Sequence, residues 1–516
     1  MSLLILQLQN NSIHSSLAST TMTLLTISLC VFAPIVAISW YLYDKVKCPK
    51  ALQNIPEVSL WKSIWAYINF LDASECFDKL VLPVITEKGV ARQFVFGKWI
   101  VMVSNPEYAK FMLMKSDIFP KIILSREQPN TLQAKLLSVN IATVNGEEWR
   151  KHRRVANPAF HRTWTTSIFG ELVFKLISEI DRSSTHVPVK ELMQRMTLDA
   201  LGKVIFDYDF NSIENQGGEM VRLYNTILTG ISSSLYTVFP FLENAPLVGR
   251  RGYQTELNKF NEFIMGIINS KLEKIRDGKP VDTQSADLVT LMIQAGESEK
   301  ERLTPEEIRN DVIIFFIAGH DTTANALSTA IYYLGLYPEY QQKAREEANR
   351  VLGDEAKNVC PTFEQQQNSL IFITAVIKES MRLNPSAAQI IPRRTTEPVQ
   401  FGEFTLPIGT PTNIHIYAMH HNPNLWENPY RFMPERFLDE TVNHDLFSWM
   451  PFGGGSRRCI GMNFSLIEQR IVLSMLVRKF SWMLPMNSVH FERLKTRPGL
   501  GLMETRNLTM NFKALY

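Results

Sequence analysis

Hydrophobic residues recur along most of this chain at the spacing of helices that bury one face, whereas two segments have the pattern of strands. Residues 93–103 alternate between apolar and polar side chains around Gly97 and Lys98, which predicts a hairpin. Residues 399–417 contain short apolar stretches separated by glycine and proline, which predicts further short strands. The pattern therefore predicts a mainly α-helical protein with small β-sheets.

The clearest predicted helix begins after Thr304. Residues 304–307, Thr-Pro-Glu-Glu, provide an N-cap hydroxyl, a proline in the first turn and a glutamate that can return the hydrogen bond. The helical pattern continues to Pro338, so the helix has about 32 residues and a length of roughly 48 Å. Its apolar centre, residues 312–319, is too short to span a membrane, which indicates a buried core helix.

The N-terminal segment has the composition of a membrane anchor. The first 43 residues contain no Lys, Arg, Asp or Glu, and residues 21–43 are largely apolar. As a helix they would extend roughly 34 Å, enough to cross a bilayer. A cleaved secretory signal is the alternative, but it would have a basic start and a shorter apolar core. Because Lys45, Lys47 and Lys50 follow, we expect the rest of the chain to lie in the cytosol.

These observations predict four segments along the chain. No repeat, low-complexity tract or Gly/Ser-rich linker interrupts the sequence after residue 56, which favours one large domain. The predicted segments are a short lumenal N-terminus (1–20), a transmembrane signal-anchor helix (21–43), a linker (44–56) and a single catalytic domain (57–516).

Composition excludes several classes of protein. Lys and Arg number 54 against 51 Asp and Glu, and no long basic block occurs, so nucleic acid is not an expected partner. The hydrophobic share of 45% supports a large core and excludes bulk disorder. The five cysteines are widely spaced without a C-x-x-C pair, which argues against a disulfide framework and against a zinc cluster.

One of the five cysteines, Cys459, follows a glycine-rich turn and precedes a helical pattern. Backbone N–H groups at such a place favour the thiolate, although a lone cysteine there is more often a structural or free thiol. The pattern of residues 452–461, F-x-x-G-x-R-x-C-x-G, resembles the haem-binding sequence of the cytochromes P-450. The resemblance implies that Cys459 is the proximal ligand of the haem iron. It also implies that Arg457 binds a haem propionate and that Phe452 lies against the sulfur side of the ring.

Residues 318–322 of the long helix, Ala-Gly-His-Asp-Thr, resemble the family's oxygen-activating motif. The resemblance implies that Asp321 and Thr322 relay protons during catalysis, and the Thr322 hydroxyl can also bond to a helix carbonyl. A glycine inside a helix costs about 1 kcal/mol relative to alanine. We therefore expect Gly319 to make room for bound oxygen. Without the other motifs, the segment would be an ordinary polar step in a buried helix.

Two further elements match the family in type and order. Glu379 and Arg382 form an E-x-x-R pair, and Arg436 follows in P-E-R-F. The resemblance implies that these three residues form a buried structural network rather than a catalytic one. Trp149 and Arg153 match the family's W-x-x-x-R helix, whose side chains reach the haem propionates.

Two assignments by resemblance concern adjacent pairs of residues. Arg393 stands where many members supply another propionate partner, although Arg394 could serve instead. His420 and His421 lie in a segment that resembles the family's connector before the P-E-R-F element, so we do not expect them to bind a metal.

The resemblance covers the chain after the anchor and implies the cytochrome P-450 fold with haem b (heme b, iron protoporphyrin IX). Electrons would come from NADPH through an FAD/FMN flavoprotein, the NADPH–cytochrome P-450 reductase, with cytochrome b5 as a further donor. The enzyme would lie in the endoplasmic reticulum membrane. It would insert one oxygen atom from O₂ into a small apolar substrate such as a lipid, steroid, terpenoid or xenobiotic.

Two other functions remain open at this point. One is a haem-thiolate isomerase or dehydratase that works without external electrons, and the other is a non-catalytic haem sensor. The intact Asp321-Thr322 pair and cysteine loop favour the monooxygenase. A basic face would then receive an acidic electron donor, and its expected residues are Arg150, Lys151, Arg154 and Arg458.

Overall fold

The computed structural model describes residues 36, 40–41, 43–44 and 46–516, with the exception of 70–71, 96, 161–165, 216–217, 232–235, 237–242, 244–249, 278–285, 296–301, 439–446 and 500–501. The predicted lumenal segment, 1–20, and most of the predicted anchor, 21–43, lie outside the described residues. Within the described part of the chain, no helix is both long and apolar enough to cross a membrane.

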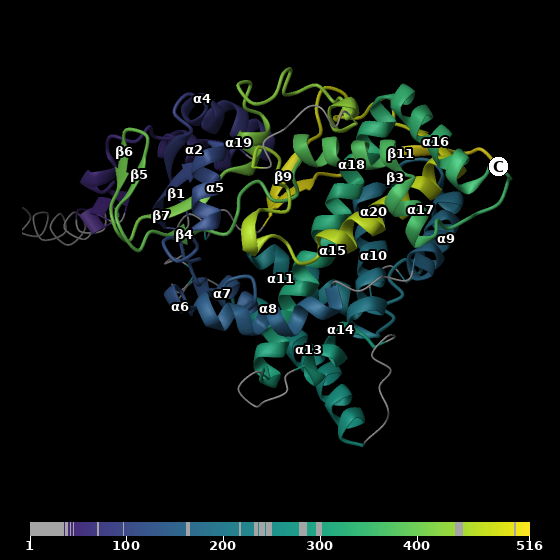
Figure 1. The fold of residues 1–516 in the computed structure, drawn as a ribbon, viewed down its shortest axis with the longest axis horizontal. Coiled ribbons are helices and arrows are strands. Elements are labelled where there is room, and N and C mark those ends of the chain that lie inside the picture. The colour runs from purple at the N-terminus through teal and green to yellow at the C-terminus, as the bar shows by residue number, and fades with distance from the viewer. Residues whose placement is uncertain are drawn as a thin grey trace, which may run out of the picture.

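Helices make up most of the described structure (Figure 1). In the first half of the chain they are α2 (Leu60–Ile68), α3 (Ala73–Cys76), α4 (Leu82–Ile85), α5 (Pro106–Met114), α6 (Leu124–Glu127), α7 (Leu132–Leu137), α8 (Gly146–Phe160), α9 (Thr166–Ser183), α10 (Val189–Leu201) and α11 (Glu219–Ile231). In the second half they are α13 (Arg251–Arg276), α14 (Leu288–Gln294), α15 (Pro305–Leu336), α16 (Pro338–Leu352), α17 (Phe363–Asn368), α18 (Ile371–Leu383), α19 (Ile416–His420) and α20 (Met462–Lys479).

The described strands form small sheets. The largest has the order β1-β2-β7-β4 and consists of β1 (Val90–Val95), β2 (Lys98–Val103), β7 (Pro411–Ile414) and β4 (Arg393–Arg394). The others pair β3 (Val187–Pro188) and β8 (Phe480–Met483) with β11 (Thr509–Ala514), β5 (Val399–Phe401) with β6 (Phe404–Leu406), and β9 (Thr496–Gly499) with β10 (Leu502–Thr505). The predicted hairpin is confirmed, since β1 and β2 are antiparallel with Val95 opposite Lys98. The short strands predicted in residues 399–417 are confirmed as β5, β6 and β7.

The predicted long helix is confirmed as α15, which has 32 residues. The Thr304 hydroxyl accepts a hydrogen bond from the Glu307 N–H at 3.1 Å, and the Glu307 carboxylate accepts one from the Thr304 N–H at 2.7 Å. The helix runs through the helical body and contacts α10, α13, α14, α16, α18 and α20. Between Ile308 and Gly335, all of which the structure describes, only Ala318 is exposed.

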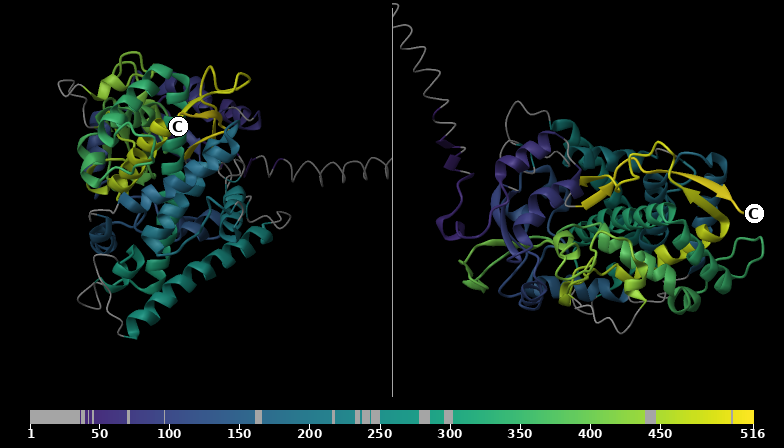
Figure 2. Two further views of the ribbon diagram at one scale, coloured as in Figure 1. Left: turned by 90° about the vertical axis from the view of Figure 1, so that its right-hand side faces the viewer. Right: turned by 90° about the horizontal axis from the view of Figure 1, so that it is seen from above.

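The helices and the main sheet occupy different ends of the molecule. Figures 1 and 2 show the purple N-terminal elements, with β1, β5, β6 and β7, gathered at one end and the helices around α15 at the other. The predicted linker contributes to the sheet end, because Leu52 and Ile55 are buried in the same apolar cluster as β1 and β2. Residues of the predicted linker therefore pack against the main sheet.

Candidate active site

Cys459 lies in a tight loop that connects a short helix, Gly455–Arg457, to α20. Gly453 and Gly455 have φ angles of +69° and +64°, a backbone region that only glycine adopts without strain. A Cβ atom at Gly455 would also lie 3.1 Å from the carbonyl oxygen of Leu113 in α5. The Cys459 N–H closes the loop by donating to the Phe452 carbonyl at 2.9 Å.

The surroundings of the Cys459 sulfur act on its protonation in opposite directions. Burial is the largest effect and raises the pKa of this thiol above its ordinary value, while a hydrogen bond from the Gly461 N–H and the positive charges of Arg153, Lys121 and Arg458 reduce that rise. The side chain nevertheless has accessible surface although it lies deep among protein atoms. A metal ion that coordinates such a thiol removes its proton outright. The sulfur is thus placed to act as an anionic ligand.

Four cationic side chains, which we call the cation cluster, gather near this sulfur. They are Lys121, Arg153, Arg393 and Arg457. Burial lowers the pKa of Arg457 to about 9, and the charges of Arg393 and Arg153 contribute to the shift. Burial and the same three arginines place the pKa of Lys121 well below its usual value. Burial also lowers the pKa of Arg153, and it lowers that of Arg393 to about 10.

The composition of the cation cluster fits a prosthetic group with two carboxylates. Like charges that are buried together destabilise one another unless anions neutralise them. Among the described groups that most affect the pKa values of Lys121 and Arg153, the Cys459 thiolate is the only anion. The Nε atom of Arg393 has no hydrogen-bond partner among the described residues. The two propionates of a haem would supply the missing acceptors and the missing charge.

Backbone carbonyls and one aromatic ring orient the arginines of the cluster. The Arg457 guanidinium carbon lies 4.5 Å from the centre of the Trp149 ring, and Nη2 donates to the Val144 carbonyl at 2.8 Å. Arg393 is 1% exposed and donates to the Phe119 carbonyl at 2.8 Å. Arg394 instead forms an ion pair with Glu127 at 2.6 Å and is partly exposed. The structure therefore brings Arg393, rather than Arg394, into the cluster.

Lys121 was not predicted as a site residue. Its ammonium donates to the Ala142 carbonyl at 2.8 Å, and its backbone N–H donates to Asn145 Oδ1 at 2.8 Å. A single lysine after a proline is ordinarily a surface charge, and nothing in its sequence neighbourhood marks it as buried. Only the contacts with distant segments place it beside Arg457.

A buried polar contact between His152 and Asp311 fixes α8, which carries Trp149 and Arg153, against α15. His152 Nδ1 lies 2.6 Å from Asp311 Oδ2, and both side chains are almost completely buried. Asp311 Oδ1 also accepts a hydrogen bond from the Ile141 N–H at 2.6 Å. Trp149 and Arg153 flank His152 in the sequence, so this pair determines where their helix lies relative to α15.

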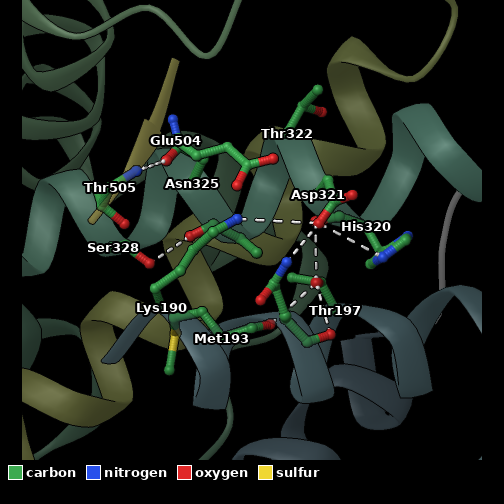
Figure 3. A network of polar contacts seen from close by, with 12 residues as sticks. Lys190, Met193, Thr197, His320, Asp321, Thr322, Asn325, Ser328, Glu504 and Thr505 are labelled. Atoms are coloured by element: carbon green, nitrogen blue, oxygen red, sulfur yellow. Dashed lines mark hydrogen bonds and ion pairs between the residues drawn. The ribbon is translucent and has the colours of Figure 1, made fainter. Parts of the chain in front are cut away.

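Asp321 is held in a polar network between α10, α11 and α15 (Figure 3). Its Oδ1 accepts from Gln194 Nε2 at 2.6 Å and lies 3.9 Å from the Lys190 ammonium, while Oδ2 accepts from the Tyr224 hydroxyl. Burial alone would raise the pKa of Asp321, but His320, Lys190, Tyr224 and Gln194 together lower it below its usual value. Asp321 is therefore a carboxylate at neutral pH.

Thr322 projects from α15 on a different side from these contacts (Figure 3). Its hydroxyl donates to the Ala318 carbonyl at 2.6 Å, a bond that competes with the helix ladder and loosens it locally. The oxygen of this hydroxyl keeps lone pairs that can accept a further hydrogen bond. The exposed Ala318 lies one turn earlier on the same face of the helix.

The structure shows a packing reason for the glycine at position 319. A Cβ atom at this position would lie 2.5 Å from Cδ1 of Leu201 in α10, so this side chain would have to shift. Leu201 is 1% exposed. The close packing of α10 against α15 therefore favours glycine here, while the expected room for bound oxygen stays a prediction.

Glu379, Arg382 and Arg436 meet in the interior, away from the polar network of Asp321. Arg382 makes two hydrogen bonds to Glu379, at 2.7 and 2.9 Å, and both side chains are fully buried. Arg436 Nε lies 3.4 Å from Glu379 Oε1, which also accepts from the Met433 N–H at 3.0 Å. The three residues thus connect α18 to the segment around Pro434–Phe437.

Comparisons with known proteins give a consistent result. The family model described as Cytochrome P450 matches residues 86–510. Cytochrome P450 4A10 from Rattus norvegicus is 27% identical over 403 residues, which are 74% of this chain and 76% of that protein. The protein named 11-oxo-beta-amyrin 30-oxidase from Glycyrrhiza uralensis is 27% identical over 76% of this chain and 75% of its own length.

The fold agrees with solved structures as well. The crystal structure of the cytochrome P450DA heme domain superposes with a TM-score of 0.74 at 21% identity. The superposition covers 90% of this chain and 97% of that one. The match includes both the helical body around α15 and the sheet end of the molecule.

Proposed function

The chain belongs to the cytochrome P450 family, and from this premise we propose that it oxidises a small apolar substrate with electrons that a flavoprotein reductase takes from NADPH. It is an oxidoreductase of the monooxygenase type that carries haem b on a cysteine thiolate and receives electrons from a redox partner. When bound, the haem supplies the activation of O₂ and the transfer of one oxygen atom to the substrate. The observation that carries the proposal is the cation cluster beside the Cys459 sulfur.

The chain's own residues hold and orient the haem in this proposal. Cys459 would supply the thiolate that holds the haem iron, and the loop that Phe452 closes keeps its sulfur in place. The four residues of the cation cluster would bind the two propionates. The Trp149 ring packs against the Arg457 guanidinium, whose Nη2 already donates to the Val144 carbonyl, so the remaining N–H groups of this arginine would donate to a propionate in the plane of the guanidinium.

Asp321 and Thr322 deliver protons to the side of α15 that carries Ala318. The Asp321 carboxylate accepts hydrogen bonds from Gln194 and Tyr224 and lies close to the Lys190 ammonium, so these groups hold it in its charged form, ready to accept a proton. The Thr322 hydroxyl accepts a hydrogen bond while it donates to Ala318, so it can pass a proton onward. Glu379, Arg382 and Arg436 take no part in this transfer and preserve the fold.

We propose a lipid, steroid, terpenoid or xenobiotic as the substrate. The segments that the family resemblance assigns to substrate contact are mostly apolar, and they include residues 119–143, 387–391 and the described parts of 208–253 and 500–503. An apolar lining with few polar groups suits such molecules. A screen of these classes by ligand-binding difference spectra would identify the class that binds.

We also propose that residues 21–43 anchor the protein in the endoplasmic reticulum membrane, with the catalytic domain in the cytosol. Trp40, Tyr41 and Tyr43 are exposed at the end of the apolar segment, where aromatic residues commonly lie at the membrane surface. This topology suits NADPH–cytochrome P-450 reductase as the electron donor, with cytochrome b5 as a further donor. Protease protection of residues 57–516 in sealed microsomes would contradict it.

The experiment that tests the function combines a spectrum with turnover. The reduced, carbon monoxide-bound protein should show the absorption of a thiolate-ligated haem, and the Cys459→Ser variant should lose it. Product formation should then require both NADPH and the reductase. Rearrangement of an organic peroxide without NADPH, and without reductase-dependent products, would favour the isomerase instead.

A further inference from the structure

His420, at the end of α19, and the adjacent His421 are both buried but differ in what they contact. His421 Nδ1 bonds to the Tyr417 carbonyl at 2.9 Å, and its ring stacks on the Tyr417 ring at a centroid distance of 4.0 Å. His420 instead bridges two segments that are distant in the sequence. It lies between Arg382 of α18 and Met450, which precedes the cysteine loop.

Both ring nitrogens of His420 contact the main chain. Nε2 lies 3.1 Å from the Met450 N–H, which can only donate, so Nε2 is the acceptor. Nδ1 therefore carries the proton and donates to the Arg382 carbonyl at 3.1 Å. Burial and the Arg382 charge lower the pKa of His420 to about 3, so the ring stays neutral. Arg382 returns a bond from Nη1 to the His420 carbonyl at 2.8 Å.

These bonds continue into the cysteine loop. The Met450 carbonyl accepts from the Gly453 N–H at 2.9 Å, and two residues after Met450 the Phe452 carbonyl accepts from the Cys459 N–H at 2.9 Å. The same stretch is tied to α18 at a second point, because Trp449 Nε1 donates to the Lys378 carbonyl at 3.2 Å. A shift of Met450 would therefore move the backbone that holds Cys459.

We propose that His420 is a positioning residue for the thiolate ligand, because its neutral imidazole fastens the start of the cysteine loop to Arg382. The proposal rests on the proposed function, in which Cys459 is the ligand of the haem iron. It assigns the second histidine, His421, to packing alone. Arg382 then has two roles. It pairs with Glu379, and its carbonyl accepts the hydrogen bond from the histidine that holds the loop.

Two substitutions separate the two bonds of His420. In His420→Gln the side-chain oxygen can take the place of Nε2 and accept from Met450, whereas the donor to Arg382 is lost. In His420→Asn the side-chain nitrogen can take the place of Nδ1 and donate to Arg382, whereas the acceptor for Met450 is lost. His421→Gln is the matched control, because it changes an equally buried histidine that does not contact the loop.

Two measurements on the full-length chain test the proposal. The first is hydrogen exchange at the Met450 amide, which does not depend on activity. The second is the fraction of the reduced, carbon monoxide-bound protein that shows thiolate ligation. We expect His420→Asn to speed the exchange by about tenfold or more and to lose most of the thiolate form. We expect His420→Gln to stay within about threefold of the wild type and His421→Gln to match it.

Three outcomes would overturn the proposal. One is a His420→Asn variant that behaves like the wild type, and another is equal loss in the Asn and Gln variants, which would indicate packing. The third concerns the wild-type chain, in which the Met450 amide should exchange as slowly as the buried amides of α18. Much faster exchange at Met450 would overturn the proposal. A wild type without any thiolate spectrum would contradict the proposed function, while Met450 exchange would still report on His420.

Discussion

At the scale of single residues, neighbouring polar and charged groups determine the protonation state of a buried side chain. Asp321 has a lowered pKa although it is almost completely buried, because four neighbouring groups favour its charged form. A carboxylate whose pKa is lowered by folding stabilises the protein at pH values above the carboxyl pKa of the unfolded chain. This contribution is lost as the pH falls through the lowered pKa. Asp321 therefore stays ionised throughout the neutral range.

Tyr224→Phe should move the acid limb of the pH profile for product formation to higher pH. The hydroxyl of Tyr224 bonds to Asp321 Oδ2, and removing a donor from a buried carboxylate raises its pKa. Loss of one bond to a charged group corresponds to a shift of about one pH unit. The measurement is the ratio of product formed to NADPH consumed as a function of pH.

Tyr332→Phe is the control for this prediction. Tyr332 is also a buried tyrosine, but it lies further along α15 and its hydroxyl donates to the His490 carbonyl at 2.8 Å. Its removal should leave the acid limb in place. An unchanged limb in Tyr224→Phe would show that the hydroxyl does not control the protonation of Asp321.

Contacts between whole elements explain residues that local propensity does not. The close approach of α10 to α15 at Leu201 favours a residue without a side chain at Gly319. The contact between His152 and Asp311 likewise holds α8 on α15. Helix α15 thus supports both α8 and α10.

Gly319→Ala should lower the free energy of unfolding by up to about 2 kcal/mol. Overpacking against the buried Leu201 costs about 1–3 kcal/mol, of which the gain of about 1 kcal/mol in helix propensity offsets only a part. Denaturant unfolding measures the difference, and Leu201→Ala in the same chain should recover part of the Gly319→Ala loss.

Gly266→Ala in α13 is the control, because its Cβ would have no atom within 4 Å. That variant should be more stable by about 1 kcal/mol. Stabilisation in both variants would contradict the packing explanation.

At the scale of the whole molecule, the expected basic face is only partly available to a partner. Arg150 pairs with Glu147, and Lys151 pairs with Glu307 at 3.0 Å. Arg154 and Arg458 are exposed. Arg150 is exposed as well, whereas Lys151 is partly buried, so docking of an acidic electron donor should depend mainly on the three exposed arginines.

Reductase-driven turnover should fall as ionic strength rises, whereas turnover with a peroxide should change much less. Raising the salt concentration from about 0.1 M to about 1 M shortens the Debye length from about 10 Å to about 3 Å, which screens exposed charges. Arg458→Gln should weaken the salt dependence. Lys88→Gln should not, because Lys88 pairs with Glu403 at 2.9 Å near the sheet end of the molecule. Equal loss by both routes would contradict docking through this face.

Local features were predictable from the sequence because they depend on neighbouring residues. The capping box at Thr304 and the hairpin at Gly97 involve residues only a few positions apart, and both are confirmed. Gly453 and Gly455 adopt the left-handed backbone that a glycine turn before Cys459 suggests. Motif order likewise led to the family, which the family model confirms.

Only the tertiary structure decided which distant residues share an environment. Neither the choice of Arg393 over Arg394 nor the burial of Lys121 is visible in the sequence around them. The contact of Gly319 with Leu201 and the bond from Met450 to His420 join positions 118 and 30 residues apart. Burial, charge repulsion and hydrogen bonding at these places depend on packing between elements. The sequence by itself determines local structure through neighbouring residues. The burial, charge interactions and hydrogen bonds that give these residues their roles form only when the helices pack together.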